Sequence, residues 1–230
     1  ANTPAGSYTI TYSYCEVLNP TNCTGTQTLV VTVGAVTLTV DNDIFNIPDG
    51  LTTQTTTSVL TNDRLNGNVP TAGVGGTVTI TNVVPATPVR TGAKVPELNP
   101  NDGKVTIPAG TPAGTYTITY KECESLNPSS NCRTATAVIK VGVPTITVTP
   151  DPITAAPSTS TQTTPSILNN DKIGSTVTPT VGVGGNVTLT VTNPTGTTVP
   201  TLDKDTGKVT IPANTPAGSY TITYSYCEVL

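Results

Sequence analysis

The sequence lacks several residue types on which common protein chemistry depends. Its 230 residues include no histidine, methionine or tryptophan, and only 10% are charged, against roughly 25% in an ordinary soluble domain. Without histidine the chain has no Ser-His-Asp or Cys-His catalysis, no histidine-ligated zinc and no imidazole proton shuttle. We therefore expect a protein that is not an enzyme.

Low charge and the absence of long apolar runs exclude two further classes of interaction. The net charge is −4, and the ten basic residues are spread thinly along the chain. Nucleic acids and anionic membrane surfaces attract clusters of Lys and Arg, so neither is expected as a partner. No run approaches the roughly 18 apolar residues that indicate a transmembrane helix, so we expect no membrane span.

An internal duplication is the dominant pattern. The segment ANTPAGSYTITYSYCEVL at 1–18 recurs letter for letter at 213–230, at an offset of 212 residues. A diverged copy, GTPAGTYTITYKECESL, occupies 110–126, so the period contains two related modules. Such repeats predict an array in which the partners of each unit are further copies of itself in tandem along the same chain.

Short runs of alternating residues predict an all-β fold. Val, Ile, Leu and Tyr recur at every second position, as on the buried face of a strand, and threonine, which fills 52 positions, takes the other face. Turn residues separate the runs, for example Asn-Gly at 66–67 and Asp-Gly at 102–103. Six or seven strands in about 105 residues predict an immunoglobulin-like β-sandwich, with a small closed barrel as the alternative. The clearest runs are VTLTV (36–40), TVTIT (77–81), KVTI (104–107), YTITY (116–120) and ATAVIKV (135–141).

The module boundaries are expected at two glycines, Gly34 and Gly142, each of which ends one strand run just before the next begins. We predict a complete module at 35–142 and a second one at 143–230 that lacks its last strand. Residues 1–34 would then be the C-terminal hairpin of a preceding module. Because the linkers are so short, the tandem sandwich modules are expected to be arranged end to end.

The five cysteines predict disulfide bonds that close hairpins. Cys15 and Cys23, and likewise Cys123 and Cys132, flank Asn-Pro turns in CEVLNPTNC and CESLNPSSNC. Their spacings match neither a redox CxxC motif nor paired zinc ligands, and buried free thiols are the alternative. The partner of Cys227 is expected beyond the end of the chain. Disulfides indicate an oxidising compartment, so we expect an extracellular, cell-surface location.

A few acidic residues are candidates for a calcium site. Calcium requires six to eight oxygen ligands, and the loops that carry Asp41, Asp43 and Asp63 would meet near one end of a sandwich. The equivalent site in the second module is weaker, because Thr149 stands in the place of Asp41. Turn capping by these aspartates is the competing interpretation, and no other cofactor is expected.

Two strings in the sequence resemble a known family. TPAGTYTITYKECESLNPSSNC, with SVLTNDRL upstream, is similar to the tandem repeats of giant cell-surface adhesins of gliding Bacteroidetes, the SprB-type adhesins. The VLTND element is also similar to bacterial immunoglobulin-like and cadherin-like array domains, although Arg64 and Lys172 stand where the cadherin-like pattern has acids. The resemblance implies long surface filaments that are exported by type IX secretion and moved by the gliding motor. It also implies a surface or polysaccharide as the partner at the filament tip.

These features favour a structural repeat of a long extracellular filament or adhesin that acts in surface attachment and gliding force transmission. The alternative is a carbohydrate- or ice-binding β-sandwich module, suggested by the many Thr-x-Thr triplets. Because strands in a sandwich twist relative to one another by about 20° or more, the triplets would not form one flat array, and we interpret them as solvated outer faces.

Overall fold

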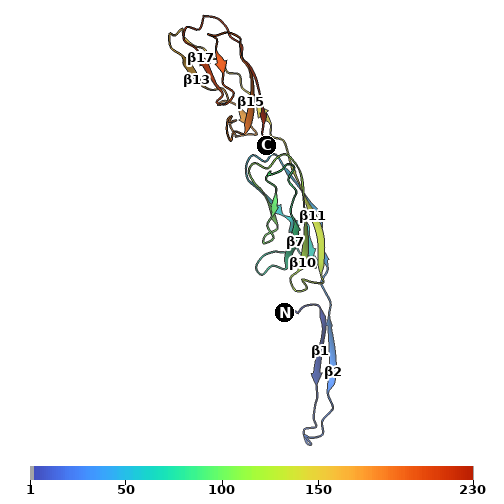
Figure 1. Cartoon of the computed structure of the whole chain (residues 1–230). Helices are drawn as coiled ribbons and strands as arrows, with labels where there is room; N and C mark the ends of the chain where they lie inside the picture. Colours follow the sequence, from blue (N-terminus) through green and yellow to red (C-terminus); the bar gives the residue numbers. More distant parts are fainter. Residues whose placement is uncertain (1–2, 230) are drawn as a thin grey trace. The chain divides into compact units, whose positions relative to one another are not determined.

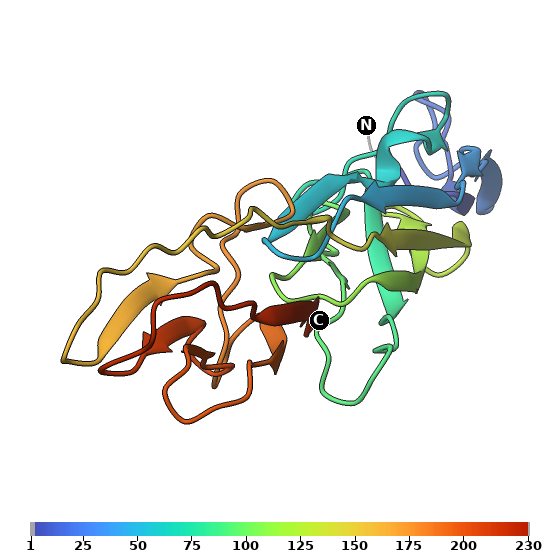
Figure 2. The same ribbon diagram turned by 90° about the horizontal axis from the view of Figure 1, so that it is seen from above.

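The computed structural model describes residues 3–229, without the side chains at positions 82 and 83. This part of the chain contains strands, loops and one short 3-10 helix, and no α-helix (Figures 1 and 2). The all-β fold class predicted from the sequence is confirmed. The chain forms two compact units, which are described separately below: unit 1 comprises residues 1–46, 53–108 and 114–140, and unit 2 comprises 47–52, 109–113 and 141–230.

Unit 1 contains a β-sandwich preceded by a hairpin. Its main sheet has the strand order β4-β11-β10-β7, a second sheet has the order β5-β9-β8, and β3 pairs with β6. The elements are β1 (Gly6–Tyr12), β2 (Gln27–Val33), β3 (Leu38–Thr39), β4 (Asp43–Ile47), β5 (Gln54–Ser58), η1 (Val59–Thr61), β6 (Arg64–Leu65), β7 (Val78–Val84), β8 (Glu97–Leu98), β9 (Lys104–Ile107), β10 (Gly114–Glu124) and β11 (Cys132–Val141).

The core of the sandwich lies between these sheets, because alternate side chains of both sheets are buried. Tyr116, Ile118 and Tyr120 of β10 are almost fully enclosed, and so are Val105 and Ile107 of β9. The intervening threonines of β10 are exposed or half-buried. The period-2 pattern of the sequence therefore gives one apolar and one polar face to each strand.

The hairpin of β1 and β2 contributes little to that core. The two strands pair antiparallel from Gly6–Val33 to Tyr12–Gln27. Every residue of β1 is exposed, and so is every residue of β2 except Val33, which is half-buried. A two-stranded hairpin is only marginally stable in water, so the exposed β1–β2 pair is expected to add little to the stability of unit 1.

Unit 2 repeats three sets of strand pairings of unit 1. Its elements are β12 (Ile146–Thr147), β13 (Gln162–Ser166), β14 (Lys172–Ile173), β15 (Val187–Thr192), β16 (Thr201–Leu202), β17 (Lys208–Ile211) and β18 (Thr223–Glu228). The pair β12–β14 corresponds to β3–β6, β13–β17–β16 to β5–β9–β8, and β15–β18 to β7–β10. β13 pairs with β17 in the register that β5 has with β9, including the same irregularity before the recurring Ser–Lys pair at Ser166–Lys208 and Ser58–Lys104. The repeat seen in the sequence is therefore a repeat of topology.

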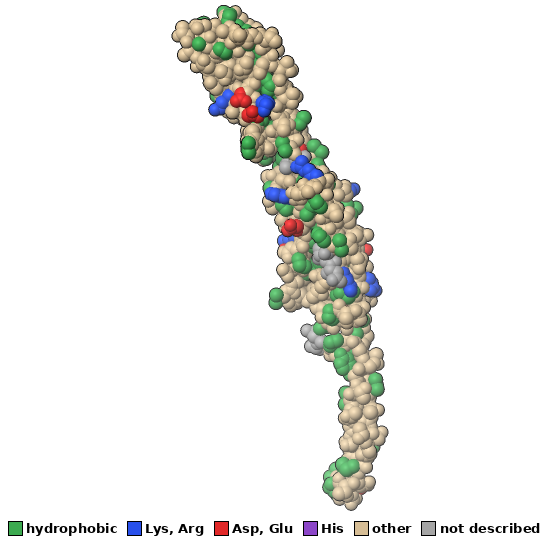
Figure 3. Space-filling model, viewed as in Figure 1, with side chains coloured by type: hydrophobic (Ala, Val, Ile, Leu, Met, Phe, Trp, Pro, Cys, Tyr) green, Lys and Arg blue, Asp and Glu red, His purple; other side chains and the backbone are tan. Residues whose placement is uncertain are grey.

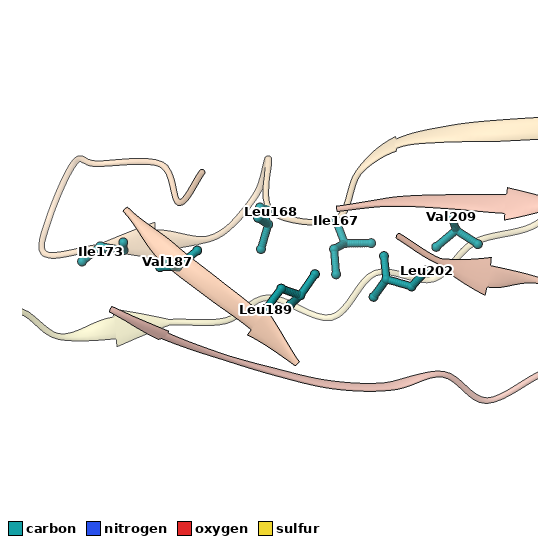
Figure 4. Packing of buried hydrophobic residues seen from close by; sticks show 7 residues of the cluster. All are labelled: Ile167, Leu168, Ile173, Val187, Leu189, Leu202 and Val209. Carbon is teal, nitrogen blue, oxygen red and sulfur yellow. The ribbon is translucent and has the colours of Figure 1, made fainter. Parts of the chain in front are cut away.

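The core of unit 2 is a cluster of aliphatic side chains contributed by several of its strands. Figure 4 shows these side chains converging between the strands. Two tyrosines and Ile222 from the C-terminal segment pack against the cluster and remain partly exposed. The cluster consists of Ile167, Leu168, Ile173, Val187, Leu189, Leu202 and Val209.

Candidate functional site

Each unit contains a buried aspartate whose side chain joins two segments of the chain. Asp63 is fully buried, and its Oδ1 accepts a hydrogen bond of 2.8 Å from the backbone N–H of Asp41. In unit 2, Asp171 is also fully buried and accepts a bond of 2.7 Å from the N–H of Thr149. Each carboxylate joins the turn of the VLTND-type element to an earlier segment of the chain, which in unit 1 directly precedes β4. The bond needs only a backbone donor, so Thr149 replaces Asp41 without loss.

The turn before each aspartate is itself capped by a serine. Ser58 Oγ accepts a bond of 3.3 Å from the N–H of Leu60, and Ser166 Oγ accepts the same bond from Leu168. The buried leucine of each turn then faces the core. Local capping and burial together position Asp63 and Asp171, which explains the recurrence of this element in the sequence.

Three carboxyl groups and a tyrosine gather inside unit 1. The hydroxyl of Tyr120 donates a bond of 3.0 Å to Asp43 Oδ2. Burial raises the pKa of Asp43 to about 6, and the nearby negative charges of Asp63 and Asp41 add to the effect while the bond from Tyr120 opposes it. Fully buried Glu122 lies beside Asp63.

The pair of Asp63 and Glu122 is short of hydrogen-bond partners. Among the described residues, Asp63 Oδ2 and both carboxyl oxygens of Glu122 have no partner at full hydrogen-bond geometry. Burial, followed by the carboxyl of Asp63, raises the pKa of Glu122 well above its ordinary value. Two adjacent buried carboxylates repel one another, so the pair is expected to hold a proton at neutral pH.

Unit 2 has a related arrangement, in which a tyrosine takes the place of the glutamate. Tyr224 donates to Asp151 Oδ2 at 3.0 Å, as Tyr120 does to Asp43. The place of Glu122 is taken by Tyr226, whose hydroxyl lies beside Asp171 and whose pKa is raised first by burial and then by that carboxylate. Burial also raises the pKa of Tyr224 to about 12, so the hydroxyl stays protonated.

The three aspartates predicted to bind calcium differ in their burial. Asp63 is fully buried, Asp43 is nearly so and Asp41 is exposed. Within residues 3–229, no group of three or more acidic or cysteine side chains is arranged to hold a metal ion. Calcium binding at Asp41, Asp43 and Asp63 stays a prediction. In the observed contacts, the side chain of Asp63 accepts a hydrogen bond from the backbone N–H of Asp41.

Both predicted hairpin disulfides are present. Cys15 is bonded to Cys23 and Cys123 to Cys132, with Cα atoms 3.9 and 4.0 Å apart. Cys227 is exposed and carries a free thiol. The prediction of a partner for Cys227 beyond residue 230 lies outside the described residues.

The turn closed by Cys123 and Cys132 contains a polar cluster that sequence reasoning missed. Glu124 Oε2 accepts bonds from the side-chain amides of Asn127 (2.8 Å) and Asn131 (2.7 Å), and all three residues are buried. Asn131 also donates to the carbonyl of Val36 at 2.8 Å, which ties the turn to the start of the sandwich. The recurrence of Cys-Glu before an Asn-Pro turn, seen again at Cys15-Glu16, was the available signal.

Unit 2 contains an open groove of about 720 Å³. It is lined by residues from the segments 151–158 and 216–224 and by Leu202, Val209 and Ile211. In unit 1, the positions equivalent to these two segments are β4 and β10, and β11 lies between them. The groove therefore corresponds to the place of β11.

The visible surface is poor in charge. Figure 3 shows small, separated groups of acidic and basic side chains on a face made mainly of uncharged polar side chains and backbone. Over the described part of the chain, no helix is long and apolar enough to cross a membrane.

Comparison with known proteins gives only distant likenesses. No family model and no curated protein sequence matches the chain. Among solved structures, it is similar to extracellular domains 1–4 of Drosophila N-cadherin (12% identity, 96% of this chain and 54% of that one, TM-score 0.34). It is also similar to extracellular domains 3–6 of protocadherin gamma B2 (10%, 95% and 55%, 0.31) and to an endo-fucoidan hydrolase of glycoside hydrolase family 107 (13%, 98% and 32%, 0.36). The chain spans about half the length of the two cadherin structures, and likenesses this weak say nothing about function.

Proposed function

We propose that the chain is a structural repeat of a long extracellular cell-surface filament or adhesin, acting in surface attachment and the transmission of gliding force. The observation that carries this proposal is the recurrence of three sets of strand pairings, β3–β6, β5–β9–β8 and β7–β10, as β12–β14, β13–β17–β16 and β15–β18, in a sequence that repeats 1–18 exactly at 213–230. Repetition of a whole module without a change of register is typical of arrays that provide length.

The internal contacts suit a load-bearing module. Asp63 and Asp171 each join a turn to a neighbouring segment, and the Cys123–Cys132 bond prevents the β10–β11 hairpin from opening at its turn. Extension of such a hairpin must break its hydrogen-bond ladder instead of unravelling its loop. We infer a non-catalytic role, since the sequence contains no histidine and the buried Asp63 and Asp171 serve these structural bonds.

The location follows from the disulfides. Hairpin disulfides persist in oxidising compartments, and this supports an extracellular position. Gliding motility and type IX export are inferred from the resemblance of TPAGTYTITYKECESLNPSSNC to the SprB-type adhesins. The expected partners are further copies of the unit in tandem and a surface or polysaccharide at the filament tip.

Labelling of intact cells tests this proposal. An antibody raised against the folded chain is applied to unpermeabilised cells that express the parent protein, followed by immunogold electron microscopy. We expect label at regular intervals along thin filaments outside the cell, and antibody-coated beads should be carried along gliding cells. Label confined to the cytoplasm, or beads that bind and never move, would contradict the respective part of the proposal.

The exposed threonines favour one second candidate, a carbohydrate- or ice-binding module. Thr188 and Thr190 of β15 and Thr117 of β10 point outward. Retention of the chain on polysaccharide columns, or thermal hysteresis in its solutions, would favour this candidate over a purely structural repeat. Thr188→Val together with Thr190→Val should then abolish the effect without changing the melting temperature by more than a few degrees.

A further inference from the structure

Two asparagines in the turn between β10 and β11 bind the backbone of distant segments. Oδ1 of Asn127 accepts a hydrogen bond of 2.9 Å from the backbone N–H of Ala5, which lies directly before β1. Nδ2 of Asn131 donates a bond of 2.8 Å to the carbonyl of Val36, which lies between β2 and β3. The two contacts therefore reach the chain on both sides of the β1–β2 hairpin.

Glu124 fixes the orientation of both amide groups. Its Oε2 accepts bonds of 2.8 and 2.7 Å from the Nδ2 atoms of Asn127 and Asn131. A carboxylate oxygen can only accept, so each asparagine must turn its NH2 group toward Glu124. Oδ1 of Asn127 is then left to accept the bond from Ala5. The second N–H of Asn131 is left to donate to Val36.

The turn that carries these amides is itself fixed to the sandwich. The disulfide bond between Cys123 and Cys132 joins its two ends. The hydroxyl of Ser125 donates a bond of 2.8 Å to the carbonyl of Gly76, and its backbone N–H donates one of 2.9 Å to the carbonyl of Thr77. Both carbonyls lie directly before β7. Bonds from this turn to the hairpin therefore orient the hairpin relative to the sandwich of unit 1.

The turn of the β1–β2 hairpin carries the same three residue types in an exposed position. Asn22 donates a bond of 3.0 Å to Glu16 Oε2, and hydrogen bonds from Asn19 and Asn22 lower the pKa of Glu16. All three residues are exposed, whereas the glutamate and the two asparagines of the β10–β11 turn are 4%, 7% and 8% exposed. The arrangement of carboxylate and amides therefore forms within a turn of this sequence and does not require burial.

We propose that Glu124, Asn127 and Asn131 form a clamp that binds the backbone of residues 5 and 36 and holds the hairpin in one orientation on unit 1. Bonds to backbone groups do not depend on the side chains at the two bound positions, so the clamp tolerates sequence change in the segments that it holds. Burial of a carboxylate is unfavourable unless hydrogen bonds satisfy it, and the two amide donors meet this need.

Packing contributes little to the orientation of the hairpin. Every residue of β1 is exposed, and so is every residue of β2 except Val33. The bonds of the clamp, together with the covalent connection through Gly34, therefore orient it. The value of the clamp in a filament, as a joint that resists bending, rests on the proposed function. The clamp itself belongs to unit 1 and is tested in the chain alone.

The test removes either partner of one bond in the full 230-residue chain and follows single backbone amides by NMR. Asn127→Ala removes the acceptor of the Ala5 N–H, and Asn19→Ala, at the equivalent position of the exposed turn, is the matched control. Ala5→Pro removes the donor and leaves the turn unaltered, because proline has no backbone N–H. Hydrogen exchange of the Ala5 amide reports the bond, and ¹⁵N relaxation of the β1 and β2 amides reports the motion of the hairpin.

We expect the Ala5 amide to exchange about tenfold more slowly than an unprotected amide in the wild type and in Asn19→Ala, because the bond must open before exchange. Asn127→Ala should remove this protection and leave the amides of β10 protected. In Asn127→Ala and Ala5→Pro, relaxation should show larger motion of the hairpin than in the wild type. If Asn127→Ala also exposes the amides of β10, the relaxation of Ala5→Pro decides.

Glu124→Gln tests whether the carboxylate sets the direction of both bonds. A glutamine offers one accepting oxygen and an NH2 group, so it no longer imposes one orientation on both asparagines. We expect several-fold faster exchange of the Ala5 amide, whereas Glu16→Gln in the exposed turn should leave it unchanged. Unchanged exchange in Glu124→Gln would remove Glu124 from the clamp.

Three results would each overturn the clamp as a whole. They are an Ala5 amide that is unprotected in the wild type, equal protection of that amide in Asn127→Ala and Asn19→Ala, and a hairpin as mobile in the wild type as in Ala5→Pro. None of these measurements depends on where the protein acts, so failure of the clamp is distinguishable from failure of the proposed function.

Discussion

Glu122 in unit 1 occupies the place that Tyr226 holds in unit 2, and each lies beside the buried aspartate of its unit. The neighbouring bonds, from Tyr120 to Asp43 and from Tyr224 to Asp151, are both 3.0 Å long. A tyrosine hydroxyl is a neutral donor at neutral pH. Glu122 can act in the same way only with a proton bound, which agrees with its raised pKa.

Glu122 is therefore expected to make unit 1 less stable as the pH rises. Its pKa is raised on folding, so the folded state retains a proton that the unfolded state loses above about pH 4.3. The contribution of Glu122 to the free energy of unfolding is fully present below that pH and declines as the pH rises toward the pKa of Glu122 in the folded state. A tenfold difference in proton affinity between the two states corresponds to about 1.4 kcal/mol, so melting should occur roughly 5 °C or more lower at pH 8 than at pH 5.

The variant Glu122→Gln tests this origin of the pH dependence, because an amide donates to Asp63 without titrating. We expect its melting temperature to vary less between the two pH values than that of the wild type. Glu97→Gln, at an exposed position, is the matched control and should keep the wild-type slope. An unchanged slope in Glu122→Gln would show that other groups cause the effect.

Replacement of Asp63 should lower the stability strongly only where the acceptor oxygen of its side chain is lost. Asp63→Ala leaves the N–H of Asp41 without its partner, and a hydrogen bond to a charged group contributes about 1.5–3 kcal/mol. Asp63→Asn keeps an acceptor and removes repulsion with Glu122, so urea unfolding should show a smaller loss. Asp41→Ala keeps the backbone donor and should change stability by no more than about 0.5 kcal/mol. Equal losses in Asp41→Ala and Asp63→Ala would instead favour a shared ligand.

Calcium provides a direct check on the same three aspartates. If the side chain of Asp63 serves only to accept the hydrogen bond from the backbone N–H of Asp41, the chain should melt at the same temperature in chelator and in millimolar calcium. A bound ion stabilises the folded state in proportion to the logarithm of its concentration. A melting temperature that rises with calcium, and does so less in Asp43→Asn, would restore the predicted site at Asp41, Asp43 and Asp63.

The two disulfides should differ in their effect on stability. Closing a loop of about ten residues contributes roughly 2.5–3 kcal/mol in the chain-entropy model. Replacement of Cys123 and Cys132 by alanine should lower the stability of unit 1 by about this amount, because the bond closes the β10–β11 hairpin of the core. Replacement of Cys15 and Cys23 should leave melting of the core unchanged, since β1 and β2 are exposed. Equal losses from both replacements, measured by calorimetry, would contradict this.

Much of the fold could be predicted from particular residues. KVTI at 104–107 is β9, and the runs at 116–120 and 135–141 lie within β10 and β11, because alternating β-branched residues of sufficient length form strands in most contexts. The run VTLTV at 36–40 gives only the two-residue strand β3, since its partner β6 is equally short. Strand length there depends on the neighbour.

The candidate sites were less predictable, because they depend on distant contacts. Cys15–Cys23 and Cys123–Cys132 follow from local spacing around a turn. The pairing of Asp63 with Glu122 joins residues far apart in sequence, and nothing local marks Glu122 as buried. Asp41 and Asp43, predicted as calcium ligands together with Asp63, look equivalent in sequence. Only the packing makes the side chain of Asp41 exposed and that of Asp43 buried.

By itself, the sequence determined the all-β class, the two-module period and the hairpin disulfides, since each depends on alternation, repetition or short-range spacing. Only the tertiary structure decided how the identical segments 1–18 and 213–230 behave. One copy pairs with β2 and the other with β15, and residues 218–222 do not form the strand that residues 6–10 form. The physical reason is that a strand is completed by hydrogen bonds to its neighbours, which identical sequences do not carry with them.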